Sequence, residues 1–271
     1  MVVRNQGADE RSQRPKVLAR RAILSKAAAA GTVAWIAPVF TPVRASAQPS
    51  PSPIDLLFGI NWNSSNASGL YTVDRSSGAW TLVGSTGVEQ GAGLAWDSLN
   101  GQMWACTQNG NSCRIDRLTG AATSVTAVGL ACGGMTYDST NDVLLGCAWN
   151  TNSTYVVDRS TGAWSLLGPS GLAMGRQARG MAYDPVTDTT FGCDSQHLMY
   201  TVDASTGAWT VLGPTGVTQT ESGLEYDTST DTLYGCAFNG GLYTVDPGTG
   251  AWSLVGVGSV PGVPLGLAYV A

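Results

Sequence analysis

Beyond residue 56, apolar and polar residues form short segments that are either alternating or apolar throughout, and tight turns separate them. Residues 232–236, with the sequence TLYGC, are one example. Segments of this length and pattern are typical of β-strands, whereas amphipathic helices need longer stretches with a period near 3.6. The 35 glycines, nine tryptophans and nine tyrosines of the chain also favour short strands joined by tight turns.

A hairpin motif of Asp, two variable residues, Ser or Thr, and Gly occurs five times. The Asp carboxylate of such a turn can accept hydrogen bonds from backbone N–H groups, and the Gly supplies the positive φ that closes the loop. Ala-Trp follows directly in four copies, and Ala122 replaces the tryptophan in the second copy. The segments that end in this motif are 71–78, 113–120, 155–162, 200–207 and 243–250.

A second motif of five residues begins with Gly and, in its first four copies, ends in Asp. Its copies are 93–97, 134–138, 180–184, 223–227 and 266–270. A four-residue turn leads from each of the first four into another strand, so each repeat holds four strands. One position of this next strand is Cys106, Cys147, Cys193 and Cys236 in successive repeats, at spacings of 41, 46 and 43 residues. That is the length of a propeller blade.

The two ends of the repeat region complement each other. The region begins with a second strand at 57–61 and ends with a lone first strand at 266–270. We therefore predict an all-β fold over residues 57–271: a five-bladed β-propeller with four-stranded antiparallel blades, closed by pairing of the C-terminal strand with the N-terminal blade. An open β-solenoid, the alternative, would leave 266–270 without a partner strand.

The chain before the repeats has the features of an export signal. Arg20-Arg21-Ala22-Ile23-Leu24-Ser25-Lys26 precedes an apolar segment at 27–40 and a small-residue site at 45–47. It resembles a twin-arginine signal peptide, which implies a secreted or periplasmic protein. We expect residues 1–47 to be the signal and 48–56 a Pro/Ser linker. The apolar segment is too short for a membrane span, which needs about 20 residues.

Charge narrows the choice of partners. Eight of the 14 basic residues lie in the predicted signal, which leaves six arginines against 17 acidic residues beyond residue 47, a net charge of −11. Nucleic acids and anionic membranes require a basic face, so neither is an expected partner. The remaining 224 residues suffice for one domain, and we expect a monomer.

The repeats LYTVDxxTGAWxLxG and GLxYDxxTDTLYG resemble propeller repeats of many secreted bacterial proteins of unassigned function. They are distantly similar to those of quinoprotein and lactonase-type propellers. In the quinoprotein repeat the tryptophan lies further from the turn, so no quinone cofactor is implied. Lactonase-type rings usually have more blades, so their metal site does not transfer to this chain. No cofactor and no metal is expected.

Candidate binding residues lie in the loops of varying length and content that lead into the inner strands and into the third strands. These loops share one face of the ring, and function usually lies on variable loops of a rigid scaffold. Arg176 and Arg179 could hold an anionic group, with Glu89 and Glu221 opposite; alternatively, Arg179 and Glu221 form an ion pair between blades. Trp149, like Trp62 and Phe238, could stack on a sugar.

Glu225 stands where the other inner strands have Ala or Thr. A carboxylate at this crowded position is costly unless it is paired or hydrated. It could serve as a general base or metal ligand, or it could pair with an arginine or a water chain. The recurring turn aspartates are expected to stabilise turns rather than bind calcium, and the recurring tryptophans to pack between blades rather than stack on sugars.

The cysteines allow one disulfide. If Asn109-Gly110 forms a two-residue turn, Cys106 faces Cys113, and an oxidising compartment permits a bond between them. The residues leave open whether this bond forms. Cys132 is expected to stay unpaired near the channel mouth. A zinc cluster is not expected, because the only histidine, His197, lies in a predicted turn distant from that mouth.

Two functions are compatible with these residues. We favour a non-catalytic binding module that takes a glycan, peptide or protein on the variable loops, because no catalytic set is recognisable. The alternative is a hydrolase or lyase with an acidic, metal-containing central channel that uses Glu221 and Glu225. A structural or adhesive surface protein is a third possibility.

Overall fold

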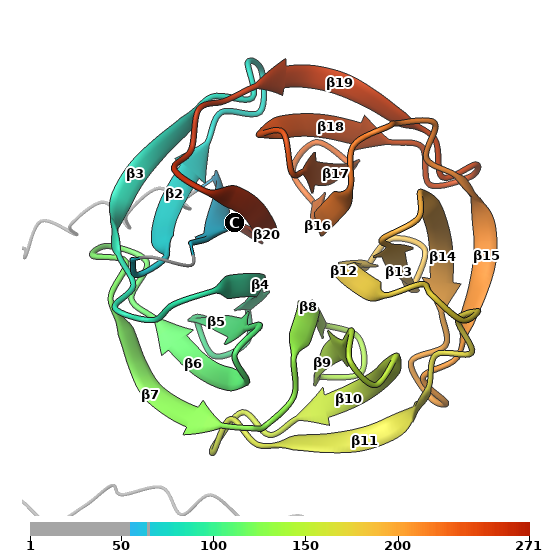
Figure 1. The fold of residues 1–271 in the computed structure, drawn as a ribbon, viewed down its shortest axis with the longest axis horizontal. Helices are drawn as coiled ribbons and strands as arrows, with labels where there is room; N and C mark the ends of the chain where they lie inside the picture. The colour runs from blue at the N-terminus through green and yellow to red at the C-terminus, as the bar shows by residue number, and fades with distance from the viewer. Residues whose placement is uncertain (1–54, 64–65) are drawn as a thin grey trace, which may run out of the picture. The chain divides into compact units, whose positions relative to one another are not determined.

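Alternation of apolar and polar residues places one β-strand after another along the chain. A computed structural model describes residues 55–63 and 66–271, and within them every regular element is a strand. Four strands hydrogen-bond side by side in each of five antiparallel sheets. The sheets stand as blades around a central axis (Figure 1). The chain is thus a five-bladed β-propeller, as predicted.

The strands are named here from the inner to the outer edge of each blade. Blade 1 contains β20 (Val263–Val270), β1 (Leu56–Trp62), β2 (Gly69–Val73) and β3 (Trp80–Ser85); blade 2 contains β4 (Gly91–Asp97), β5 (Gln102–Thr107), β6 (Asn111–Ile115) and β7 (Ala122–Ala127); blade 3 contains β8 (Cys132–Asp138), β9 (Val143–Ala148), β10 (Ser153–Val157) and β11 (Trp164–Pro169); blade 4 contains β12 (Ala178–Asp184), β13 (Thr189–Asp194), β14 (Leu198–Val202) and β15 (Trp209–Pro214); and blade 5 contains β16 (Glu221–Asp227), β17 (Thr232–Ala237), β18 (Gly241–Val245) and β19 (Trp252–Val257).

The C-terminal strand closes the ring. β20 pairs antiparallel with β1, with Leu57 opposite Tyr269 and Phe58 opposite Ala268. Blade 1 therefore takes its inner strand from the end of the chain and its other three from the start, which confirms the predicted closure (Figure 1). An open solenoid is excluded.

A glycine in every inner strand lets neighbouring blades approach closely. A Cβ atom built on Gly180 would lie 2.7 Å from the backbone N of Leu224 and the backbone O of Ser222, in the next inner strand. Across the ring, Cα atoms of β8 come within 8 Å of Cα atoms in β16 and β20. At this level the inner strands therefore lie close together, both between neighbouring blades and across the ring. The five glycines, named here the glycine ring, are Gly93, Gly134, Gly180, Gly223 and Gly266.

The tryptophans of the outer strands pack inward within their own blades. The Trp80 ring lies beside Tyr71, with ring centroids 5.9 Å apart, and over Gly59, where a Cβ would lie 2.1 Å from the indole. Blades 3, 4 and 5 repeat this Gly–Tyr–Trp arrangement. The tryptophans also pack between blades, as predicted: Trp209 Nε1 donates to the Thr154 hydroxyl of blade 3 at 3.0 Å, and Trp80 shares a core cluster with Leu242 of blade 5. Packing rather than sugar stacking is therefore their role. Blade 2 replaces all three members of the arrangement, with Ala105, Cys113 and Ala122.

The recurring aspartates stabilise turns, as predicted. Asp74 accepts hydrogen bonds from the backbone N–H groups of Ser76 and Ser77, at 2.8 and 2.9 Å, and from the Ser76 hydroxyl. These bonds stabilise the carboxylate and lower the pKa of Asp74 to about 2. Asp116, Asp158, Asp203 and Asp246 accept the same two backbone bonds.

The register that would place Cys106 opposite Cys113, on which a disulfide between them depended, is wrong. Three residues rather than two, 108–110, separate β5 from β6, so Cys106 lies opposite Ser112 and Cys113 opposite Ala105. Successive side chains of a strand point to opposite faces, so this shift of one residue places the two cysteines on different faces of the blade. All six cysteines are buried free thiols, and Cys106 instead lies beside Cys132.

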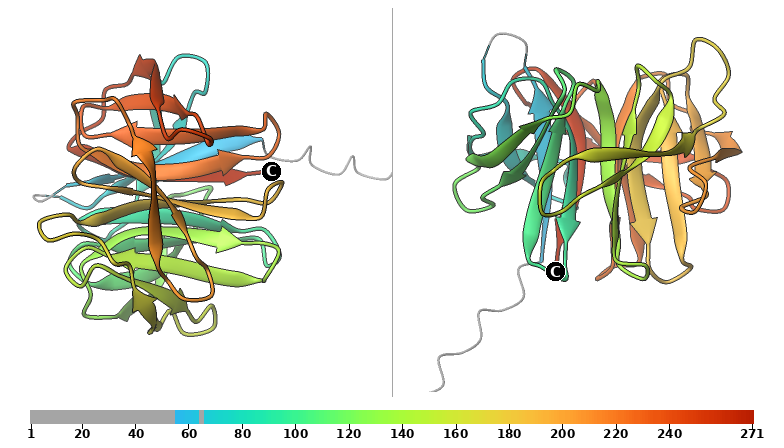
Figure 2. Two further views of the ribbon diagram at one scale, coloured as in Figure 1. Left: turned by 90° about the vertical axis from the view of Figure 1, so that its right-hand side faces the viewer. Right: turned by 90° about the horizontal axis from the view of Figure 1, so that it is seen from below.

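The loops gather at two opposite ends of the strands (Figure 2). One end, the variable face, carries the loops after the second and fourth strands; the other, the regular face, carries the turns after the first and third strands. The predicted signal, 1–47, and nearly all of the predicted linker lie outside the described residues. No helix in the described part of the chain is long and apolar enough to cross a membrane.

Substitution in the glycine ring tests the close approach of the inner strands. Gly180→Ala should lower the free energy of unfolding by about 3 kcal/mol or more, because its Cβ would collide with backbone atoms that cannot move aside. Gly248→Ala, in an exposed turn where the nearest atom is a side-chain oxygen at 3.3 Å, should change it by less than about 1 kcal/mol. Urea unfolding followed by circular dichroism measures both, and equal costs would contradict the packing.

Candidate functional site

The variable-face mouth of the channel is formed by the first residues of the inner strands. Each inner strand has a register irregularity there, just before its glycine. Such bulges redirect a side chain out of the regular pattern. The bulged residue is Arg179 in blade 4, and its counterparts are small or apolar or carry a single hydroxyl: Ala92, Gly133, Ser222 and Leu265.

Arg179 is a largely desolvated cation that has no carboxylate partner among the residues the structure describes. Its Nη2 donates to Oε1 of Gln177 at 2.8 Å, and its guanidinium lies over the Phe238 ring, 5.6 Å from the centroid. Its Nε is buried and has no hydrogen-bond partner among the described residues. Burial lowers the pKa of the Arg179 guanidinium. A cation held in this way retains donor capacity for an anion.

Arg176, three residues earlier, is already neutralised. It forms an ion pair with Asp194, whose side chain is fully buried at the end of β13. The Tyr200 hydroxyl donates to the same carboxylate at 2.7 Å, and the backbone N–H groups of Gln196 and Leu198 donate to its other oxygen. Arg176 therefore fastens the loop before β12 to its own blade, and it is not available to hold a ligand.

Glu221 does not pair with Arg179, the alternative that the sequence suggested. Its side chain is fully buried, and Nδ1 of His197 lies 3.0 and 3.1 Å from its two oxygens. The Thr215 hydroxyl donates to one of these oxygens. His197 was expected far from the channel mouth, but its turn lies on the variable face beside β16. The contact crosses from blade 4 to blade 5, and no sequence spacing indicates it.

The other two candidates on this face make no common site with Arg179. Glu89 is exposed in the loop before β4. Trp149 is half-buried; its backbone N–H donates to Ala131 O at 2.9 Å, and its indole Nε1 is buried without a hydrogen-bond partner. Phe238 is the aromatic residue that sequence reasoning placed near the mouth and that the structure brings to Arg179.

Glu225 lies at the other end of the channel, towards the regular face. One of its oxygens accepts a hydrogen bond from the backbone N–H of Tyr269, in the next blade, at 3.0 Å. It borders a cavity of about 110 Å³ that is lined by several aromatic rings and by small polar residues, and burial raises its pKa to about 8. No ion pair between described residues involves it, so it is not neutralised by an arginine. The aromatic members of the wall are Trp96, Tyr137, Tyr183, Tyr226 and Tyr269.

The two carboxylates of the acidic-channel hypothesis do not meet. Glu221 and Glu225 are four positions apart in the same strand, which corresponds to about 13 Å at the usual rise per residue. They lie on opposite sides of the glycine ring. In the described part of the chain, no group of three or more His, Cys, Asp or Glu side chains is placed to hold a metal ion.

The protonation of Glu225 makes stability depend on pH. Its pKa is about 8 in the folded protein and near 4.5 when exposed, so between these values the folded state holds a proton that the unfolded state has lost. Stability contributed by this group therefore falls as pH rises from about 4.5 to 8. Glu225→Gln, which keeps an oxygen acceptor for Tyr269, should raise Tm relative to wild type at pH 8 and match it at pH 4.5.

Thermal unfolding across this pH range checks the prediction. Glu89→Gln, which also removes one carboxylate but at an exposed position, is the control for net charge. If the Glu225→Gln and wild-type Tm values stayed parallel from pH 4.5 to 8, the buried carboxyl would not be the origin of the pH dependence.

Comparison with known proteins identifies the fold and no more. No family model matches the chain, and no curated protein does. A chain in the crystal structure of a nidogen/laminin complex matches with a TM-score of 0.55 and 12% identity, over 80% of this chain and 98% of that one. A structural genomics protein of unknown function from Bacteroides thetaiotaomicron VPI-5482 matches with a TM-score of 0.51 and 16% identity, over 73% of this chain and 55% of that one. At these identities the likeness is one of β-propeller architecture.

Proposed function

We propose that this propeller is a non-catalytic binding module that takes a carboxylate-bearing glycan, peptide or protein at the variable-face mouth. Arg179 is the residue that carries the proposal. It is the one arginine on this face whose charge no carboxylate of the described residues neutralises. A guanidinium in such a place matches the planar, two-oxygen geometry of a carboxylate.

Desolvation makes Arg179 effective as an anchor. Its charge has already lost much of its water on folding, so an anion that binds there gains attraction in a medium of low dielectric constant. The Phe238 ring beneath the guanidinium holds it in place and offers an apolar edge to the ligand. Half-buried apolar residues at strand ends and loops of the variable face add contact area: Trp62, Val128, Leu130 and Val263.

The two buried carboxylates of this mouth are engaged with neighbouring side chains, which favours binding over catalysis by either of them. Glu221 is held by His197 and Thr215, and Asp194 is held by Arg176 and Tyr200. General acid–base catalysis needs a group that can exchange a proton with the substrate, and a fully buried carboxylate in such a network is poorly placed to do so.

One observation favours the alternative, a hydrolase or lyase. Glu225 has a pKa of about 8 and borders a cavity, the properties of a general acid or base at neutral pH. That site holds a single carboxylate among aromatic rings. Loss of hydrolysis or elimination activity in Glu225→Gln, on any lactone or polysaccharide that the protein cleaves, would favour this alternative.

Binding to acidic ligands tests the role of Arg179. The probes are oligogalacturonates and short peptides with a free C-terminus, with neutral oligosaccharides and amidated peptides beside them. Arg179→Gln should weaken binding of the acidic probes at least tenfold, as expected for loss of a charge-assisted hydrogen-bond pair. Isothermal titration calorimetry measures the change.

The control variant is Arg117→Gln, because Arg117 lies on the regular face, over the Trp96 ring. It removes the same charge and should leave binding unchanged. If acidic and neutral probes bound equally, or if both variants bound as well as wild type, Arg179 would not be the anchor.

We also propose that the protein works outside the cytoplasm, on the basis of residues 20–26. A twin-arginine signal depends on both arginines. Replacing Arg20 and Arg21 with lysine should therefore retain the protein in the cytoplasm, as cell fractionation would show. Export that continued at the wild-type level would contradict the proposal.

A further inference from the structure

An arginine bridges two carboxylates between blades at two places on the regular face. In blade 3 it is Arg159, which directly follows the turn aspartate Asp158. Its Nη1 lies 3.1 Å from Asp97, at the end of the first strand of blade 2, and 2.7 Å from Asp142, just before β9. Its guanidinium also lies over the Tyr137 ring, 5.5 Å from the centroid. These three groups form a guanidinium box.

Blade 1 repeats the box with other residues. Arg75, which follows Asp74, pairs with Asp227 of blade 5 and with Asp55, the latter at 2.8 Å. It lies over the Tyr269 ring at 5.7 Å. In both boxes, the first carboxylate comes from the preceding blade and the second from the same blade as the arginine. The recurrence shows that these positions together hold a guanidinium.

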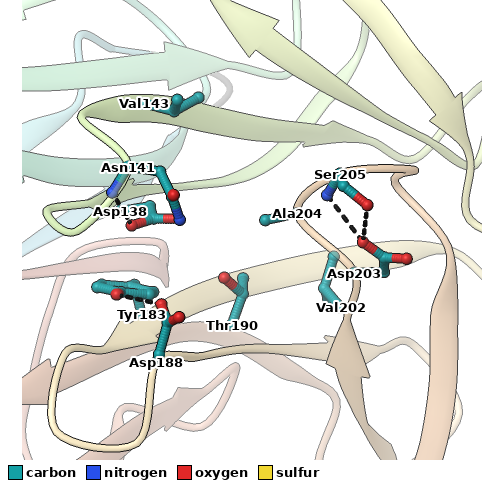
Figure 3. Close-up of a pocket in the computed structure, with 10 residues that line it drawn as sticks. All are labelled: Asp138, Asn141, Val143, Tyr183, Asp188, Thr190, Val202, Asp203, Ala204 and Ser205. Atoms are coloured by element: carbon teal, nitrogen blue, oxygen red, sulfur yellow. Dashed lines mark hydrogen bonds between the residues drawn. The ribbon is translucent and has the colours of Figure 1, made fainter.

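Blade 4 has the box but not the arginine. The corresponding carboxylates are Asp138, of blade 3, and Asp188, and the corresponding ring is Tyr183. Ala204 follows the turn aspartate Asp203 where blades 1 and 3 have arginine. A cavity of about 490 Å³ lies there, and all of these residues line it. Figure 3 shows Asp138, Tyr183 and Asp188 on one side of the cavity and Ala204 across from them.

The hydrogen bonds of the blade 4 carboxylates match those of the filled box in blade 3, except for the guanidinium. Oδ2 of Asp97 accepts from the Asn100 amide at 2.8 Å and from Arg159; Oδ2 of Asp138 accepts only the corresponding amide, from Asn141 at 2.8 Å. Asp188 accepts from the Tyr183 hydroxyl at 2.7 Å, as Asp142 does from Tyr137. Both carboxylates of blade 4 therefore retain an acceptor position facing the cavity.

We propose that the cavity between blades 3 and 4 binds the guanidinium group of a ligand, such as an arginine side chain. Asp138 and Asp188 accept its N–H donors and Tyr183 stacks beneath it, as the equivalent groups do for Arg159 and Arg75. A planar fork fits two carboxylates better than a compact ammonium does. A metal ion fits poorly, because no described cluster of acidic, His or Cys side chains is arranged to hold one.

In the remaining two blades, other residues replace members of the guanidinium box. Blade 5 has Asp184 and Asp231, but Pro247 stands at the arginine position, and the Thr187 hydroxyl donates to Asp184 at 2.6 Å. In blade 2, Arg117 is present, but β20 ends in Val270 where the other inner strands end in Asp. Only blade 4, among the five, combines two carboxylates with a small residue at the arginine position.

Titration with small guanidinium compounds tests the proposal. The probes are ethylguanidinium, and acetyl-Gly-Arg-Gly-amide for arginine within a peptide; the citrulline peptide, which is neutral, and the lysine peptide are controls. Two-dimensional amide NMR should show saturable shifts around Ala204 and Asp188, with a dissociation constant on the order of millimolar for the fragment. The citrulline peptide should cause none, and the lysine peptide should bind more weakly. Tighter binding of the arginine peptide than of ethylguanidinium would identify peptide chains as the source of the group.

Two variants make the test decisive. Ala204→Arg should fill the box with its own side chain, raise Tm, and weaken probe binding at least tenfold. Arg159→Ala should open a second box and increase the probe stoichiometry from one to two. Both results should be independent of Arg179→Gln, because the two sites lie on opposite faces. No saturable shifts near Ala204, or equal binding by the citrulline peptide, would overturn the proposal.

Discussion

The close approach of the five inner strands determines the rest of the architecture. At the glycine ring, backbone lies against backbone, so no residue with a side chain fits without displacing a neighbouring strand. This contact brings the blades to a radius at which five of them close. The glycine ring also lies between the two mouths of the channel, because Gly223 stands between Glu221 and Glu225 in β16. Arg179 occupies one mouth and Glu225 the other, and this separation is why the acidic residues of β16 do not form one site.

Much of this fold can be predicted from the sequence because the motifs of each repeat separately predict the same four-stranded blade. Local hydrogen bonding and a positive φ explain the turn aspartates and the glycines that follow them. The number of strands explains the segment at 266–270, and all of these features predict the same propeller. The length of the loop at 108–110 could not be predicted, because a two-residue and a three-residue turn look alike in sequence. The length decides whether Cys106 faces Cys113 or Ser112. The contact between His197 and Glu221 could not be predicted, because it depends on how far one blade is rotated against the next.

Candidate chemistry lies where a repeat departs from the pattern of the others. Arg179 replaces small or uncharged residues at a bulge, Glu225 replaces Ala or Thr in the channel, and Ala204 replaces an arginine in an inter-blade pair. In a protein built from repeats, the copies that keep the pattern serve as internal references. Comparison with them shows what a changed residue destabilises or which side chain is missing. Sequence comparison of the repeats found the departure at Glu225. Arg179 was a candidate because of its charge in a variable loop, and the structure then showed that it occupies a bulge. The third became visible only once the structure showed what Arg75 and Arg159 do.

The pairing of β20 with β1 has a consequence for how the protein is made. Tyr269 and Asp55, which are 214 positions apart, meet through a hydrogen bond in the finished ring. During synthesis, blades 2 to 5 can each assemble from a contiguous stretch of about forty residues as it leaves the ribosome. Blade 1 cannot, since its first three strands emerge early and must wait for an inner strand that follows blades 2 to 5 in the chain. Until β20 has been synthesised the inner edge of β1 is exposed to other strands, so the nascent chain is most open to mispairing in that interval.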